Sequence, residues 1–394
     1  MVSDLFWPGD DRAGDHLTPR AFLEAMVDVE EAWLAVLGVE GVSLHADLDD
    51  WLDHGWGRDI ESGGNPVIAV VSGLRAALEA DQPEAARWLH RGLTSQDVVD
   101  SALMTMVRDA VADLVTELRR LVRRLAELAR EHRDTPMVAR TLTQHATPTT
   151  MGLKAATWLH GVLDAWDDLE RLAFPVQVGG AAGTQAAVVE LGHDPSAARA
   201  GLARALGLAD APPWHTARRP VTRVADALVA CTDAWGRIAA DVLTLSRPEI
   251  GELSEGVGGG SSTLPHKVNP VLSTLVRRAA LTTPQLAATL HLAAADQVDE
   301  RADGAWHAEW DTIRLLVRRT LVAGAQTADL VDELRVHPDR MAATLTAARD
   351  NVLAEQRAMA ELAGHEPDGD YLGAAGELVD AVLTRASTHL EETE

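Results

Sequence analysis

The sequence predicts an all-α protein built around a bundle of long helices. Strand signals are almost absent, because alternating apolar runs are missing and the chain holds only 3 Phe and 1 Tyr. Apolar residues instead recur at intervals of three and four. The longest stripe would form a helix of roughly 45 Å, and it comprises Val99, Leu103, Met106, Ala110, Leu114, Leu118, Leu121, Leu125 and Leu128. Helices of this length bury such stripes best against one another in a bundle.

Other segments with helical spacing precede and follow this stripe. Shorter helices are expected first, over residues 18–38, 66–80 and 83–91. Longer helices are then expected from Pro148 onward and over residues 220–247, 271–296 and 304–333. Shorter helices return after Pro338. These changes in helix length predict an N-terminal helical domain over 1–95, a central bundle over 96–333 and a small C-terminal helical domain over 334–394.

Composition excludes several classes of protein. A single cysteine, Cys231, excludes an internal disulfide and a cysteine-rich zinc site. No segment is apolar enough to read as a membrane span, and residues 3–11 lack the pattern of a signal peptide, so we expect a cytoplasmic protein. The formal net charge of −25 argues against nucleic acid or a membrane surface as a partner.

Residues 258–270 combine a mobile glycine run with several polar side chains, in the order G-G-G-S-S-T-L-P-H-K-V-N-P. Asn269 is expected to cap the helix that follows, with Pro270 in its first turn. A helix N-terminus of this kind favours an anion. Lysine stands only at Lys154 and Lys267 among 35 basic residues, which favours a chemical role for Lys267. The alternative is a glycine-rich surface loop before a well-capped helix.

Two other stretches are polar and precede helices. Residues 90–97 read H-R-G-L-T-S-Q-D, and Thr94 with Asp97 satisfies a capping-box pattern. A structural cap and a carboxylate site are compatible here, because both use the same helix end. Residues 140–152 read R-T-L-T-Q-H-A-T-P-T-T-M-G.

Together these stretches resemble conserved segments of the fumarase/aspartase superfamily. Residues 258–270 resemble its G-S-S-x-M-P-x-K-x-N-P loop, with Leu264 in the methionine position, and the resemblance extends over nearly the whole chain. Members eliminate a group β to a carboxylate, or run the reverse addition. The resemblance implies a homotetramer whose helical core is shared and whose active sites are each built from three subunits. The implied partner is a small polycarboxylate substrate, and no cofactor is implied.

The same resemblance assigns roles to individual residues. Ser261 is the implied general base, and serine requires a stabilised alkoxide for that task. Lys267 and Asn269 would stabilise the aci-carboxylate formed between the two steps. The implied substrate-binding residues are His90, Thr94, Ser95, Gln96, Arg140, Thr141, Gln144, His145, Thr184, Arg218 and Ser262. For His145, capping or packing beside Pro148 is an equal alternative.

One departure from the superfamily pattern has a chemical consequence. Members that release an amine carry a histidine after the threonine of the second stretch, as the general acid, whereas this chain has Leu142. An amine must be protonated as it departs, so loss of the acid disfavours amine release. A carboxylate leaves as a stable anion without a proton. Leu142 is therefore consistent with making or breaking a bond to a carboxylate oxygen.

Three further segments resemble the muconate-lactonising cycloisomerases of the superfamily. They are the G-G-A-A-G-T of residues 179–184, the P-W-H-T-A-R of 213–218 and the E-R-A-D-G-A-W-H-A-E-W of 300–310. In that reaction a carboxylate of 3-carboxy-cis,cis-muconate adds across its own double bond. His307 and Glu309 fall on different helix faces, so no metal site is expected. Trp306 and Trp310 are expected in a core seam.

Residues 219–223 depart from the cycloisomerase pattern, because Arg219 and Arg223 replace two of its acids. This departure argues against assigning 3-carboxy-cis,cis-muconate as the substrate from the resemblance alone. Two alternatives therefore stay open. One is a fumarate-forming lyase that expels a good anionic leaving group such as nitrite, and the other is a non-catalytic helical homologue. In each enzymatic case the strongly acidic chain must gather local cations around an anionic substrate. The candidates are Lys267, Arg218, Arg277 and Arg140.

Overall fold

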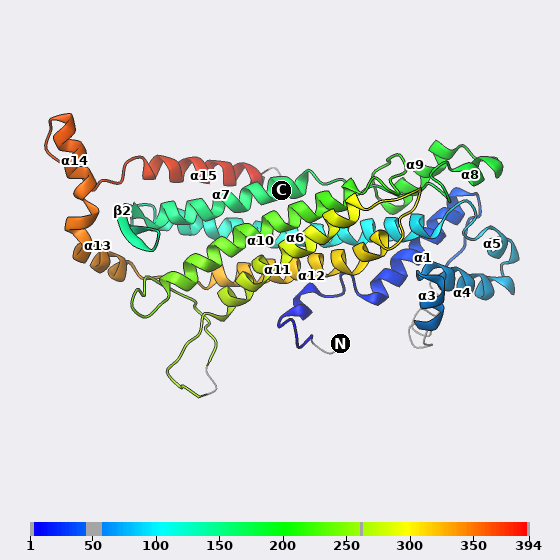
Figure 1. Cartoon of the computed structure of the whole chain (residues 1–394), viewed down its shortest axis with the longest axis horizontal. Helices are drawn as coiled ribbons and strands as arrows, with labels where there is room; N and C mark the ends of the chain where they lie inside the picture. Colours follow the sequence, from blue (N-terminus) through cyan, green and yellow to red (C-terminus); the bar gives the residue numbers. More distant parts are fainter. Residues whose placement is uncertain (1–3, 45–56, 261–262, 392–394) are drawn as a thin grey trace.

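The chain folds around a bundle of long helices that run side by side along the length of the molecule (Figure 1). This computed structural model describes residues 4–44, 57–260 and 263–391. The bundle comprises α6 (Ser95–Glu131), α7 (Met151–Glu170), α10 (Arg219–Leu245), α11 (Val271–Ala295) and α12 (Ala305–Asp332). Helix α10 packs against α7, α11 and α12, while α6 packs against α7 and α12. The predicted all-α architecture is confirmed.

Helix α6 is the longest element and carries the predicted stripe. Every residue of that stripe is buried, from Val99 to Leu128. The capping box is present as well, since the Asp97 carboxylate accepts a hydrogen bond from the Thr94 N–H at 2.9 Å. At 37 residues, the helix is about 55 Å long.

Shorter helices cover the end of the bundle where α6 begins (Figure 1). They include the helices α1 (Pro19–Val36), α3 (Gly57–Gly63), α4 (Val67–Glu79), α5 (Pro83–Trp88), α8 (Ala186–Glu190) and α9 (Pro195–Leu206). The 3-10 turn η1 (Asp10–Ala13) packs on α12 instead, where Arg12 pairs with Asp329 at 2.7 Å. Helices α1, α4 and α5 fall within the predicted ranges. Helix α1 packs directly on α6, which places N-terminal residues beside the start of the long helix.

A β-hairpin at the opposite end of the bundle corrects the sequence prediction of an almost strand-free chain. Strands β1 (Pro136–Thr141) and β2 (Gln144–Thr150) pair in antiparallel register. Pro148 lies in β2 opposite Val138 and does not open a helix. Helix α7 begins at Met151, because the Thr150 hydroxyl caps it by accepting the Leu153 N–H at 3.0 Å. The strands are too short and too polar to show an apolar alternation.

The C-terminal part returns to the bundle. After the two-residue strands β3 (Leu253–Ser254) and β4 (Arg335–Val336) come α13 (Pro338–Val352), α14 (Ala354–Ala363) and α15 (Ala375–Glu391). Helix α15 lies along α7, and Arg385 bridges them through Asp164 at 2.7 Å and Asp167 at 2.9 Å. The three-domain division stays a prediction. Within the described parts of the chain, no helix is long and apolar enough to cross a membrane.

Candidate active site

The residues expected at the site lie in three separate places on one chain. Thr94 and Ser95 begin α6, while Thr141 belongs to the hairpin that follows its C-terminus. The length of α6, about 55 Å, therefore keeps these two groups far apart. Lys267 lies in the long loop that projects from the bundle before α11 (Figure 1). Ser261 and Ser262 lie outside the described residues.

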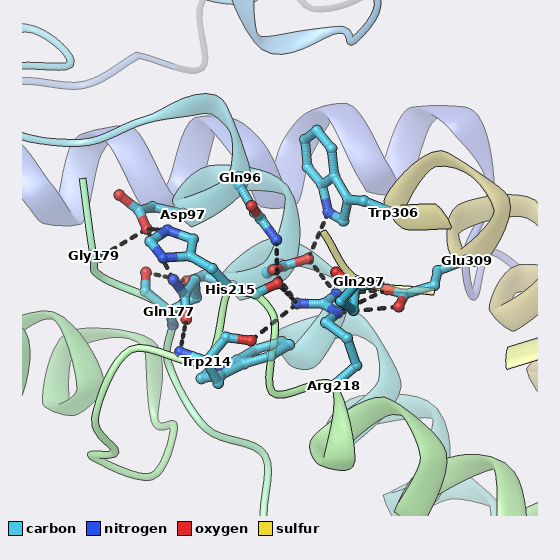
Figure 2. Close-up of polar contacts among 12 residues, drawn as sticks. Gln96, Asp97, Gln177, Gly179, Trp214, His215, Arg218, Gln297, Trp306 and Glu309 are labelled. Atoms are coloured by element: carbon cyan, nitrogen blue, oxygen red, sulfur yellow. Dashed lines mark hydrogen bonds and ion pairs between the residues drawn. The ribbon is translucent and has the colours of Figure 1, made fainter. Parts of the chain in front are cut away.

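The buried carboxylate of Asp97 organises the start of α6 (Figure 2). Besides the Thr94 N–H, it accepts the N–H of Gly179 at 2.8 Å and the N–H of Gly180 at 2.9 Å. Glycine is required at position 179, because a Cβ there would lie 2.0 Å from Cε1 of the buried His215. Asp97 thus joins the hydroxyl-bearing helix end to the glycine stretch that follows α7.

Other expected residues near this helix end differ in exposure. Thr94 and Ser95 are half-buried, and Thr184 is exposed. Gln96 is fully buried, and its amide donates to the backbone carbonyl of His215 at 2.9 Å. The contacts of Gln96 therefore favour a role in shaping this helix end over direct contact with substrate.

Arg218 lies in a buried ion-pair cluster, which corrects the expectation that it binds a substrate carboxylate. The guanidinium donates to the Asp100 carboxylate at 2.7 Å and 3.0 Å and to Oε1 of Glu309 at 3.0 Å (Figure 2). The Trp306 indole donates to Asp100 at 3.0 Å, and the guanidinium lies 4.5 Å from the ring centroid of Trp214. Arg218 therefore holds α6, α10 and α12 together.

The Glu309 carboxyl has a shifted pKa in this cluster. Burial raises the pKa of the Glu309 carboxyl above its ordinary value, although the hydrogen bond and charge of Arg218 act in the opposite direction. The cation therefore keeps a costly buried carboxylate ionised.

Arg140, in β1 close to the hairpin turn, is engaged in a similar way. Its guanidinium forms a bidentate pair with the fully buried Glu252, at 2.9 Å and 2.8 Å. Both arginines expected to receive substrate carboxylates are thus committed to carboxylates of the protein itself. The positive charge that attracts substrate carboxylates must therefore come from other groups.

Arg301 is a cation that sequence reasoning missed. Its Nη2 donates a short hydrogen bond to the Thr94 hydroxyl, and its Nε is buried without an acceptor among the described residues. The guanidinium is thus adjacent to the expected carboxylate site at the start of α6. The segment 300–310 contained this arginine, but only the fold shows that positions 94 and 301 meet.

The hairpin turn presents a group of exposed polar side chains. Thr141 pairs with Gln144 and Arg140 with His145, so the hydroxyl, amide and imidazole gather near one tip. Leu142, where amine-releasing members carry their acid, is 96% exposed. Its φ of 47° and the 70° of Thr143 are positive, as a type I′ turn requires.

The loop before α11 is closed at its base. The N–H and carbonyl groups of Gly259 and Asn269 exchange hydrogen bonds of 2.9 Å and 2.7 Å. The amide of Asn269 donates to the Gly260 carbonyl at 3.1 Å, and Lys267 is exposed. Asn269 does not cap α11, so that prediction was wrong: Pro270 occupies the N-cap position without a side-chain cap.

Glu255 satisfies the free N–H groups of α11 instead. Its carboxylate accepts the Ser273 N–H at 2.7 Å, the Ser273 hydroxyl at 2.6 Å and the Leu272 N–H at 3.2 Å. A cap from a residue 18 positions upstream gives no local sequence signal. Glu255 therefore fastens the chain entering the loop to the helix that leaves it.

Replacing Glu255 with alanine is expected to destabilise the protein by about 1–3 kcal/mol, because buried donors at the start of α11 lose their acceptor. Urea denaturation at fixed protein concentration measures this loss. Glu249→Ala, an exposed glutamate at the preceding turn, is the matched control and should change stability by less than about 0.5 kcal/mol. Equal losses would contradict the capping role.

The structure also assigns His307 and Glu309 to other contacts. The His307 Nε2 is 2.9 Å from the Gly64 carbonyl oxygen, and Glu309 is bound to Arg218. Among the described residues, no cluster of three metal-ligating side chains occurs. Trp306 is buried and meets Trp310 edge to face at 4.7 Å, as the expected core seam requires.

Comparison with known proteins shows what the chain is similar to. Residues 42–283 match the family model described as lyase. The chain is 44% identical over 303 residues to a nitrosuccinate lyase of Streptomyces davaonensis, covering 74% of this chain and 64% of that protein. It is 40% identical over 341 residues to a 3-carboxy-cis,cis-muconate cycloisomerase of Bradyrhizobium diazoefficiens, covering 84% and 73%.

Solved structures agree with this similarity. The crystal structure of the 3-carboxy-cis,cis-muconate lactonizing enzyme from Pseudomonas putida superposes with a TM-score of 0.80 and 28% identity, covering 95% of this chain and 97% of that one. The present chain thus spans just under two thirds of the nitrosuccinate lyase, but nearly the whole length of this solved structure.

Proposed function

The chain belongs to the lyase family of the fumarase/aspartase superfamily, and on that premise we propose that it breaks or forms a bond β to a carboxylate. The leaving group departs as a stable anion. The observation that carries this proposal is Leu142, 96% exposed at the hairpin tip, where an amine-releasing member needs a general acid. Release of a carboxylate or of nitrite needs no such proton.

In the proposed mechanism Ser261 exchanges the proton at carbon. In lactone formation one substrate carboxylate oxygen adds to the double bond, giving an aci-carboxylate, and the Ser261 hydroxyl then protonates the neighbouring carbon. In the eliminating direction the alkoxide removes that proton, and the C–O bond breaks toward the departing carboxylate. Lys267 and Asn269 stabilise the aci-carboxylate, which is an electrostatic role.

Substrate carboxylates are oriented by groups from the other two places. At the start of α6 these are the hydroxyls of Thr94 and Ser95, with Arg301 beside them. At the hairpin they are Thr141 and Gln144. Since α6 separates these groups by about 55 Å, we propose that several copies of the chain complete each site, in a homotetramer.

The first substrate we propose is 3-carboxy-cis,cis-muconate. Three stretches of the chain match the cycloisomerase pattern, and the similarity to such a protein covers 84% of the chain. Nitrosuccinate is the second candidate, and its elimination would give fumarate and nitrite. It is favoured by the 44% identity to a nitrosuccinate lyase and by Arg219 and Arg223. The fold accommodates Arg219 through an ion pair with Asp226 at 3.2 Å.

Assaying both compounds with the purified protein decides between them. We expect loss of the conjugated diene of 3-carboxy-cis,cis-muconate together with lactone formation, and no fumarate or nitrite from nitrosuccinate. Fumarate and nitrite in equal amounts, with no lactone, would replace the first substrate by the second. Cleavage of adenylosuccinate or argininosuccinate at a comparable rate would contradict the proposed chemistry itself.

A further inference from the structure

A buried carboxylate from α1 contacts the histidine that begins the stretch 90–97. Oε1 of Glu30 lies 2.6 Å from Nδ1 of His90, and Glu30 is 0% exposed. Its second oxygen, Oε2, has no hydrogen-bond donor among the described residues. A carboxylate buried this deeply is costly unless it is paired. His90 is the partner that the structure provides.

The charges around His90 favour its protonated form. Burial alone would lower the pKa of His90, but the hydrogen bond and charge of Glu30 and the charge of Asp97 raise it above its ordinary value. Arg75 on α4 acts in the opposite direction. A raised pKa means that the imidazolium persists to a higher pH than in the unfolded chain. The stability that this pair contributes is complete at acid pH and is lost as pH rises through the raised value.

The backbone around His90 is held firmly. His90 has a φ of 63°, a left-handed conformation that needs support from its surroundings. The Trp33 indole donates to the Arg91 carbonyl at 2.7 Å, and Arg75 donates to the Leu89 carbonyl at 3.1 Å. Helices α1 and α4 thus fix the imidazole on the short loop that enters α6 at Thr94.

We propose that Glu30 is a positioning residue whose buried carboxylate holds Nδ1 of His90, so that His90 binds the same substrate carboxylate as Thr94 and Ser95. This rests on the proposed function. Arg218, which reaches α6 near its start, is committed to Asp100 and Glu309, so its charge is already neutralised there. In a chain of net charge −25, an imidazolium at His90 would add to the charge of Arg301, which contacts Thr94, and supply the attraction that a polycarboxylate needs.

The test uses Glu30→Gln, which removes the charge and keeps the size of the side chain. Its matched control is Glu24→Gln on the same helix, where the half-buried Glu24 pairs with Arg20 at 2.9 Å. The first measurement follows hydrogen–deuterium exchange at the imidazole Cε1–H of His90 by peptide mass spectrometry across pH. We expect the pH at the midpoint of this exchange curve to be lower in Glu30→Gln than in the wild type, and to be unchanged in Glu24→Gln. Addition of fumarate, used as a dicarboxylate probe, should raise the midpoint in the wild type.

The second measurement is the pH profile of kcat/KM with the substrate that the wild type turns over. Glu30→Gln should raise KM about tenfold near neutral pH, leave kcat within about threefold, and move the high-pH limb to lower pH. His90→Asn keeps a hydrogen-bond donor for Glu30 but cannot titrate, so it should abolish the high-pH limb of the kcat/KM profile. An unchanged exchange midpoint in Glu30→Gln, or a fumarate-insensitive midpoint in the wild type, overturns the inference. Because exchange requires no turnover, these outcomes stand even if neither proposed substrate reacts.

Discussion

Replacing Ser261 with alanine is expected to lower kcat at least about a thousandfold, the scale of losing a residue that carries proton transfer itself. The serine hydroxyl is the only group in the proposed mechanism that moves a proton to or from carbon. Lys267 and Asn269 would still bind and polarise the substrate, so KM should change far less than kcat. Steady-state kinetics with the reacting substrate measure both constants.

Two controls separate this effect from a folding defect. Thr274→Ala removes an exposed hydroxyl on α11 that donates to the Pro270 carbonyl at 2.8 Å, and its kcat should remain within about twofold. Size-exclusion chromatography with light scattering should give the same mass for all three proteins. Near-normal turnover in Ser261→Ala would exclude Ser261 as the base.

The same variant also tests whether sites are shared between copies. A Thr141→Val, Gln144→Leu double variant should be inactive because its hairpin no longer orients the substrate. Ser261→Ala should be inactive because its loop lacks the group that transfers the proton. Mixed oligomers of the two should regain part of the wild-type activity, because some sites then receive both intact segments from different copies. No recovery from verified mixed oligomers would contradict the shared site.

The long helices were predictable because their signal is local and repeated. The apolar stripe from Val99 to Leu128 and the capping box of Thr94 and Asp97 agree across the sequence and the structure. The hairpin was missed because its strands are short and polar. Asn269 was assigned to the cap because it stands beside Pro270, whereas the acceptor is supplied by Glu255 from before the loop.

The motifs at the site were also predictable, but the partners of their charged residues were not. Arg218 belongs to a stretch that pointed to substrate binding, and nothing nearby in sequence revealed Asp100 or Glu309 as its partners. Arg301 and Glu30 were overlooked for the converse reason. Each acts on the segment 90–97 from an element far away in sequence, so the pairing depends on tertiary packing alone.

Replacing Arg218 with methionine is expected to cost about 3–5 kcal/mol of stability, the penalty for leaving buried charges without their partner. Methionine fills much of the same volume but leaves Asp100 and Glu309, both almost fully buried, facing each other without a cation. Urea denaturation at fixed protein concentration measures the loss, since oligomers gain stability with concentration. Arg219→Met is the control, because Arg219 is exposed and its pair with Asp226 should contribute under about 1 kcal/mol.

The pH dependence of that loss identifies its cause. Burial already raises the pKa of Glu309, and removal of Arg218 takes away the group that opposes the rise. A carboxyl whose pKa is higher in the folded state favours folding below its unfolded pKa, and this contribution is lost as pH rises through the folded value. The deficit of Arg218→Met should therefore be largest near neutral pH and shrink as pH falls toward 5, while Arg219→Met shows no such trend. A deficit independent of pH would mean that lost packing, and not the unpaired carboxylates, accounts for the instability.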